Sequence, residues 1–209
     1  MRIRKTAEHR KAEIVDATLR LAGELGPERL TTEAIAGAVG LTQPAIFRHF
    51  PKKQALWSAV AERIGSVMEA RWAKGQQGDA TPLGQIRAVV VAQLQLIQKM
   101  PAIPAILFSR ELHTRNQGLR EAFFGLLIRF HRIVADLAAR ARAAGELRGD
   151  LEPDDAAFLI LGLVQGLAIR WSISGRSFDL AEEGSRLLDL QLRGFADRPV
   201  RVRREEAMS

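Results

Sequence analysis

The sequence predicts an all-α protein, and three features of its 209 residues lead to this prediction. Residues that favour helices, such as alanine, leucine, arginine and glutamate, dominate the composition. Tyrosine is absent, and runs of β-branched residues are rare. Apolar residues also recur at the three- and four-residue spacing of amphipathic helices. We therefore expect about nine helices, in a chain long enough for one large or two modest domains.

Four helices are expected in the first third of the chain. The first spans about residues 9–25, where apolar residues share one face, and Gly26 with the proline after it ends the helix. Two short helices follow between residues 31 and 50. Pro51 separates them from a fourth helix over about residues 52–74.

Five further helices are expected over residues 82–100, 105–113, 119–144, 154–173 and 180–196. Prolines begin or interrupt several of them, and a glycine follows the longest one, in the position that ends helices. The tail over residues 198–209 is too polar to bury and is expected to be disordered. The predicted division is a domain of residues 1–51, a connecting helix of residues 52–74, a second domain of residues 75–197 and the tail.

The two short helices have the pattern of a helix-turn-helix. Thr31 or Thr32 can cap the first helix, and Gly40 fits the left-handed position that ends it. Thr42 can cap the second helix, which turns apolar residues inward at a spacing of four. In a helix-turn-helix the second helix enters the major groove of DNA. The pattern therefore predicts a DNA-binding unit.

The outward-facing residues of this unit form the candidate DNA-binding surface. Its expected members are Thr32, Thr42, Gln43, Pro44, Ala45, Phe47, Arg48, His49 and Lys53. Gln43 can pair with adenine and Arg48 with guanine, while the Ala45 methyl or the Phe47 ring can touch a thymine methyl. The threonines, His49 and Lys53 are expected to hold the DNA backbone. The alternative role for Arg48 is that of a solvated or phosphate-bound cation that contacts no base.

The same segment resembles the DNA-binding domain of TetR-type transcriptional regulators. The resemblance covers about the first sixty residues and rests on Thr31-Thr32, Ile35-Ala36, Gly40-Leu41-Thr42, Ile46-Phe47-Arg48-His49-Phe50-Pro51, Lys53 and Leu56. Phe47 stands where this family usually has tyrosine, so a phenol that could donate to a phosphate is missing. The resemblance implies a regulator, more often a repressor than an activator, that is released from DNA by a small molecule.

A single short helix reads few base pairs, so a two-fold dimer on a pseudo-palindromic operator is expected. The helices over 154–173 and 180–196 are the candidates for the interface, and the resemblance implies that they form a four-helix bundle with their mates. The candidate interface residues are Phe158, Gly162, Gly166, Leu188 and Leu192. The helix over 154–173 is apolar nearly all round, which also fits a helix in the core of the monomer.

The residues beyond the DNA-binding unit are more than a dimer needs, and the resemblance implies a ligand cavity among their helices. The candidate lining residues are Trp72, Phe108, Phe123, Gln165 and Trp171. Each of the aromatic residues also fits an ordinary core position. Because so many aromatic and aliphatic positions surround such a cavity, we expect a small, mostly apolar effector.

Composition and motifs narrow the class of protein. A net charge of +7 and a pI near 10.7 suit a polyanionic partner. The absence of cysteine excludes disulfides, zinc fingers and thiol nucleophiles, and it fits a reducing cytoplasm. We expect no cofactor, no metal and no enzyme activity, because the chain has none of the common serine-hydrolase, zinc-protease or phosphate-loop motifs. The alternative function is a helical small-molecule-binding protein without sequence-specific DNA binding.

The N-terminus is basic but has no apolar stretch after it, so no signal peptide is expected. No apolar stretch is both long and charge-free enough to cross a membrane, and the longest, from Ala156 to Ile169, covers about fourteen residues. Five cations oppose a single Glu8 near the start, namely Arg2, Arg4, Lys5, Arg10 and Lys11. They form either an arm along the DNA or a solvated terminus.

Overall fold

The computed structural model describes residues 6–196, and all its regular structure is helical within that range. The helices are α1 (Ala7–Leu25), α2 (Thr32–Ala38), α3 (Gln43–His49), α4 (Lys53–Gln76), α5 (Pro82–Lys99), α6 (Ala102–Leu107), α7 (Arg110–Arg115), α8 (Gln117–Ala143), α9 (Pro153–Ile173) and α10 (Leu180–Ala196). The all-α prediction is confirmed. The predicted arm residues Arg2, Arg4 and Lys5 and the predicted tail lie outside the described residues.

The count of ten helices in the described range differs from the expected nine because residues 102–115 form two helices. Pro104 lies within α6 and does not precede it. The hydroxyl of Ser109 accepts a hydrogen bond of 3.1 Å from the backbone N–H of Leu112, so this serine starts α7. A capping serine thus divides a segment in which apolar spacing alone had indicated one helix.

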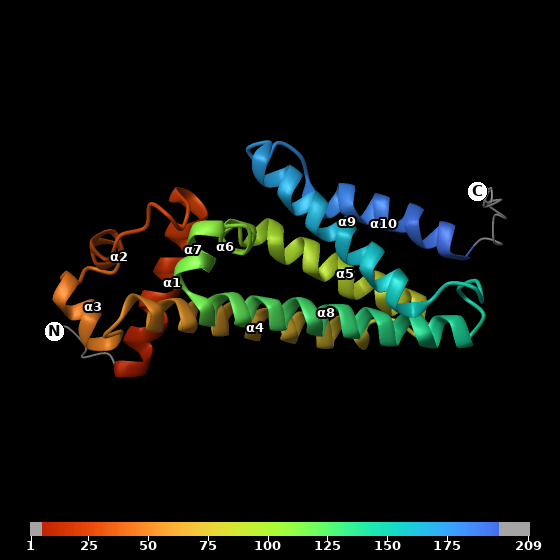
Figure 1. Ribbon diagram of the computed structural model, residues 1–209, viewed down its shortest axis with the longest axis horizontal. Helices are drawn as coiled ribbons and strands as arrows, with labels where there is room; N and C mark the ends of the chain where they lie inside the picture. Colours follow the sequence, from red (N-terminus) through yellow and green to blue (C-terminus); the bar gives the residue numbers. More distant parts are fainter. Residues whose placement is uncertain (1–5, 197–209) are drawn as a thin grey trace, which may run out of the picture.

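The helices form a small head and a larger body (Figure 1). The head, α1 to α3, lies at one end, and the long helices α4, α5, α8, α9 and α10 extend away from it. The α4 helix packs against α1 in the head and against α5 and α8 in the body. A single continuous hydrophobic core runs from Ile14 in α1 to Phe195 in α10. The head is therefore attached to the body by packed side chains.

Helix α9 is both long and rich in apolar residues. It is long and apolar enough to cross a membrane by length and composition, with a mean hydropathy of 1.7. The sequence predicted no such stretch, since its longest apolar run ends at Ile169, whereas the helix continues to Ile173. Here α9 packs against α8 and α10. Such a helix is weak evidence for a membrane span, because core helices meet the same criteria.

Ion pairs and helix caps hold the body together at its surface. Arg87 of α5 and Asp189 of α10 pair at 2.7 Å, and hydrogen bonding to the guanidinium lowers the pKa of the Asp189 carboxyl. The pKa of Asp79 is lowered because the backbone N–H of Thr81 donates to its carboxylate. The pKa of Asp179 is lowered in the same way by the N–H of Glu182. These three carboxyl groups with lowered pKa values lie at the ends or on the outer surface of body helices, outside the head.

The closest approach of α4 and α5 depends on Gly75. A Cβ atom added there would lie 2.9 Å from the backbone N and Cα of Val89. We expect Gly75→Ala to lower the free energy of unfolding by about 1–3 kcal/mol, because the two backbones would have to separate. Urea denaturation followed by circular dichroism measures this change.

Gly37→Ala is the matched control, because an added Cβ on this α2 glycine meets no atom within 4 Å. Its stability should stay the same or rise by up to about 1 kcal/mol, since alanine favours helices. Equal unfolding free energies for the two variants would contradict the close packing of α4 on α5.

Candidate functional site

The helix-turn-helix is built by local hydrogen bonds and one glycine. Thr31 caps α2, because its hydroxyl accepts from the N–H of Ala34 at 3.1 Å. Thr32 has a different role. Its hydroxyl accepts a 2.8 Å hydrogen bond from Nε2 of Gln43 and so joins the start of α2 to the start of α3. Gly40, at φ 66°, makes the left-handed turn between the helices. The two helices are thus held at both ends of the turn.

The outer face of α3 carries most of the predicted DNA-contacting residues. Thr42, Gln43, Pro44, Phe47 and Arg48 are exposed, and His49 is partly buried. Phe47 is 41% exposed, which is unusual for a phenylalanine and places its ring on the outer face. Thr42 occupies the N-cap position of α3, but its hydroxyl makes no capping hydrogen bond, contrary to expectation.

Ala45 was predicted to lie on this outer face, and that prediction is wrong. Its side chain is only 7% exposed and belongs to the buried side of α3 with Ile46. Adjacent residues on a helix lie only about 100° apart, so a broad inward face can hold both Ile46 and its neighbour Ala45. A contact between the Ala45 methyl and a thymine is therefore excluded in this geometry.

Lys53 begins α4 next to α3 and is tied to the head. Its Nζ donates to the carbonyl oxygen of Leu30 at 3.1 Å, so the ammonium fastens the start of α4 to the α1–α2 loop. Arg48 and Lys52 have no ion pair with any residue in the range 6–196, whereas Arg10 pairs with Glu13 at 2.8 Å. Arg48 and Lys52 are therefore exposed cations without a counter-charge among the described residues, a condition that they share with other surface cations such as Lys74 and Lys99.

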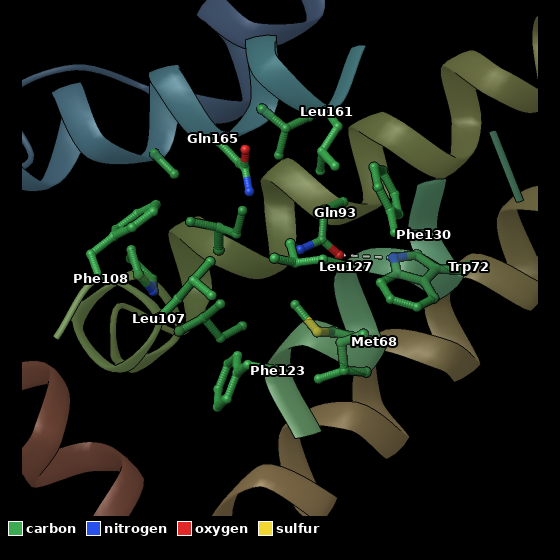
Figure 2. Close-up of a pocket in the computed structure, with 16 residues that line it drawn as sticks. Met68, Trp72, Gln93, Leu107, Phe108, Phe123, Leu127, Phe130, Leu161 and Gln165 are labelled. Carbon is green, nitrogen blue, oxygen red and sulfur yellow. Dashed lines mark hydrogen bonds between the residues drawn. The ribbon is translucent and has the colours of Figure 1, made fainter. Parts of the chain in front are cut away.

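A cavity lies in the body between α4, α5, α6, α8 and α9 (Figure 2). Four of the predicted ligand residues line it: Trp72, Phe108, Phe123 and Gln165. Its free volume is about 40 Å³. That volume is room for little more than a water molecule, whereas ligand pockets usually measure roughly 300–1,000 Å³. The structure therefore shows a closed form of the cavity.

Trp171 was predicted to line this cavity, and it does not. Its indole N–H donates to the carbonyl oxygen of Phe178 at 3.0 Å, and Arg176 lies over its ring. Ala168 is the last α9 residue in the cavity wall. Trp171 lies almost one turn further along and instead holds the turn into α10.

Gln93 of α5 is a cavity residue that the sequence reasoning missed. Its side-chain oxygen accepts a 2.8 Å hydrogen bond from the indole N–H of Trp72, and both side chains are buried. The signal was present in the sequence, because Gln93 interrupts the apolar stripe of its helix between Val90 and Ile97. A polar residue at a core position needs a partner or a ligand.

The outer face of α9 and α10 carries exposed apolar residues, most of them on α9. Phe158 is 65% exposed, and Ile169, Ile173 and Leu190 are also exposed large hydrophobic residues. Gly162 and Gly166 are exposed on α9 as well, with open space beside them. The spacing of the α9 residues places them along one stripe of the helix.

Leu188 and Leu192 were predicted to lie at this face, and the structure places them in the core of the monomer. They follow Gly184 at a spacing of four along α10, and an added Cβ on Gly184 would lie 2.6 Å from Leu94 of α5. The stripe that packs against α5 is therefore the one that carries these leucines. Leu190, two residues away, points outward.

Two family models match the sequence and together cover more than half of it. Residues 14–60 match "Bacterial regulatory proteins, tetR family", and residues 104–181 match "Tetracyclin repressor-like, C-terminal domain". The HTH-type transcriptional regulator TtgR of Pseudomonas putida is 27% identical over 197 residues, which is 91% of this chain and 93% of TtgR. The nucleoid occlusion factor SlmA of Haemophilus ducreyi is 26% identical over 136 residues, 63% of this chain and 67% of SlmA.

Solved structures share the whole fold at low sequence identity. A transcriptional regulator from Saccharomonospora viridis in complex with choline has a TM-score of 0.78 and 18% identity, over 89% of this chain and 96% of its own. FadR from Bacillus subtilis in complex with stearoyl-CoA has a TM-score of 0.72 and 21% identity, over 88% and 98%. The head with its helix-turn-helix and the helical body both match, and the chain belongs to the TetR family of bacterial transcriptional regulators.

Proposed function

We propose that this chain is a homodimeric repressor that binds a pseudo-palindromic operator and is released from it by a small, mostly apolar effector. The observation that carries the proposal is the outer face of α3, where Gln43, Phe47 and Arg48 are exposed and no acidic residue interrupts the face. A DNA partner would place the protein in the cytoplasm.

The hydrogen bond between Thr32 and Gln43 supports a base-reading role for Gln43. An amide pairs with adenine by donating one N–H to N7 and accepting from the N6 amino group. The Gln43 NH₂ group has two hydrogens, and Thr32 occupies one of them. The other hydrogen and the amide oxygen stay free in a held orientation, which is the arrangement that adenine requires.

Backbone contacts are assigned to the residues around the ends of α3. The Thr42 hydroxyl is not used in a cap, so it is available to a phosphate. His49, Lys52 and Lys53 lie at the other end of α3, between its last residue and the start of α4. Such contacts position the protein on the duplex without reading sequence.

A second copy of the chain is the proposed cover of the α9–α10 outer face. An apolar stripe with two glycines lets helices approach closely, and a two-fold axis places the same stripe on both sides. The pair of heads could then read two half-sites about 34 Å apart.

The cavity is the proposed effector site, because it is coupled to the head through α4. Met68 and Trp72 in its wall belong to α4, and only three residues separate α4 from α3. Since the closed cavity has about 40 Å³ free, any effector must push its walls apart. An effector that prefers the opened form lowers operator affinity tenfold for about 1.4 kcal/mol of coupling.

Gln43→Ala is expected to relax the preference at one base pair of each half-site, by about 1–3 kcal/mol. Thr32→Val, which keeps the size of the side chain but removes the acceptor for Gln43, should act in the same direction with a smaller loss. Site selection from random duplexes with the full-length protein measures both. Unchanged base preferences would show that Gln43 does not read the operator, and recovery of no sequence at all would favour the alternative of a ligand-binding protein without specific DNA binding.

Lys53→Ala is expected to weaken binding to every sequence alike and to reduce the salt dependence by about one charge, because one phosphate contact is lost. The melting temperature should be recorded alongside, since Lys53 also binds the carbonyl of Leu30. A loss confined to one operator sequence would speak against a backbone contact.

Ile169→Asp is expected to convert the dimer to a monomer, because symmetry would bury two unpaired carboxylates in the apolar face. Leu25→Asp in α1 is the control, with a side chain of similar exposure (42% against 38%) on a different surface. Light scattering after size exclusion gives the mass of each. A dimer in both variants would place the interface elsewhere.

A further inference from the structure

The polar groups of the cavity are few and uncharged. Its sixteen lining residues include no lysine, arginine, histidine, aspartate or glutamate. Apart from the indole N–H of Trp72, the polar side-chain groups are the amides of Gln93 and Gln165. These two side chains come from α5 and α9 and extend toward the same space (Figure 2). Any polar recognition in this cavity must therefore use these amides.

Trp72 decides which end of the Gln93 amide is available. An indole N–H is a donor and never an acceptor, so the 2.8 Å contact must be made by the amide oxygen of Gln93. The NH₂ group then points away from Trp72, as Figure 2 shows. Within residues 6–196 this NH₂ group has no hydrogen-bond acceptor, although Gln93 is only 5% exposed.

A polar group in the wall of an apolar cavity that has no protein partner marks a place where a ligand can supply one. The amide of Gln165, which is partly buried, likewise has no hydrogen bond to any residue in the described part of the chain. The Gln93 NH₂ is a fixed donor, whereas the Gln165 amide can rotate to donate or accept. The cavity thus offers one oriented donor within an apolar wall.

We propose that the effector is a neutral, mainly apolar molecule with a carbonyl-type oxygen, such as a ketone, ester or lactone, that accepts a hydrogen bond from Gln93. The inference rests on the proposed function, in which this cavity is the effector site. Gln93 is then the residue that sets specificity, and Trp72 is a positioning residue that holds its amide. A carboxylate or an ammonium group is disfavoured, because no counter-charge lines the cavity.

The test uses benzophenone and diphenylmethane, which share a skeleton and differ in a carbonyl against a methylene. The cost of opening the cavity is nearly the same for both, so their affinity ratio reports the net gain from the hydrogen bond after the carbonyl has been desolvated. Isothermal titration calorimetry on the full-length protein should show benzophenone binding about tenfold more tightly. The charged analogue 4-benzoylbenzoate should bind more weakly than benzophenone by at least about tenfold.

Gln93→Leu should abolish the preference for the ketone. Because this change leaves the Trp72 N–H without an acceptor, a double variant, W72F with Q93L, removes both partners and guards against misfolding. Gln85→Leu is the matched control on the same helix: Gln85 is also buried, but its Nε2 donates to the carbonyl of Asp79 at 2.8 Å, away from the cavity. This control should keep the full preference.

The binding measurement needs no DNA, so it separates this inference from the proposed function. Equal affinity for the ketone and the hydrocarbon, no ketone binding, tighter binding of the carboxylate, or an unchanged preference in Gln93→Leu would each overturn the inference. Retention of ketone preference without any effect on operator binding would support the recognition chemistry and reject the effector role of the cavity.

Discussion

The burial of one side of α4 along its whole length is the interaction on which the rest of the molecule depends. Buried residues recur on this helix from Leu56, beside the head, to Gly75, at the far end of the body. Three residues separate the end of α3 from the start of α4, and Lys53 at that start is hydrogen-bonded to the head. We infer that a displacement of α4 in the body moves α3, because only three residues lie between the two helices.

The body contains both a closely packed region around α5 and a cavity. The close contacts at Gly75 and Gly184 bring α4 and α10 against α5, so this region has little freedom to change shape. The cavity lies between α4, α5, α6, α8 and α9, where Phe108 in its wall is exposed and Leu161 is partly exposed. An entering molecule would separate elements around the cavity while the packing at Gly75 and Gly184 holds.

Local signals made the head predictable. Caps, a glycine in the left-handed conformation and an apolar spacing of four all lie within thirty residues, so the two short helices were correctly placed from sequence. The side-chain orientation within them was harder to predict. Ala45 is small enough to fit either face of a seven-residue helix, and its burial is decided by how α3 packs on α1 and α2.

The body shows where sequence reasoning fails. Leu188 and Leu190 are the same residue type two positions apart, and only the close packing at Gly184 decides which one faces inward. From the sequence, Trp171 and Phe123 were equally good candidates for the cavity wall. Phe123 of α8 lines the cavity, whereas α9 leaves the wall after Ala168, before it reaches Trp171. Gln93 was overlooked because its partner, Trp72, lies 21 residues away in the chain, on another helix.

The most direct test of the coupling through α4 is the distance between the two heads in the dimer. The chain has no cysteine, so Arg29→Cys on the exposed α1–α2 loop gives one spin-label site per subunit. Pulsed electron paramagnetic resonance would compare the operator-bound protein with protein whose cavity is saturated with benzophenone, as judged by calorimetry. If α4 couples the cavity to the heads, the distance between the labels changes, and an unchanged distance distribution with the cavity filled would rule this coupling out.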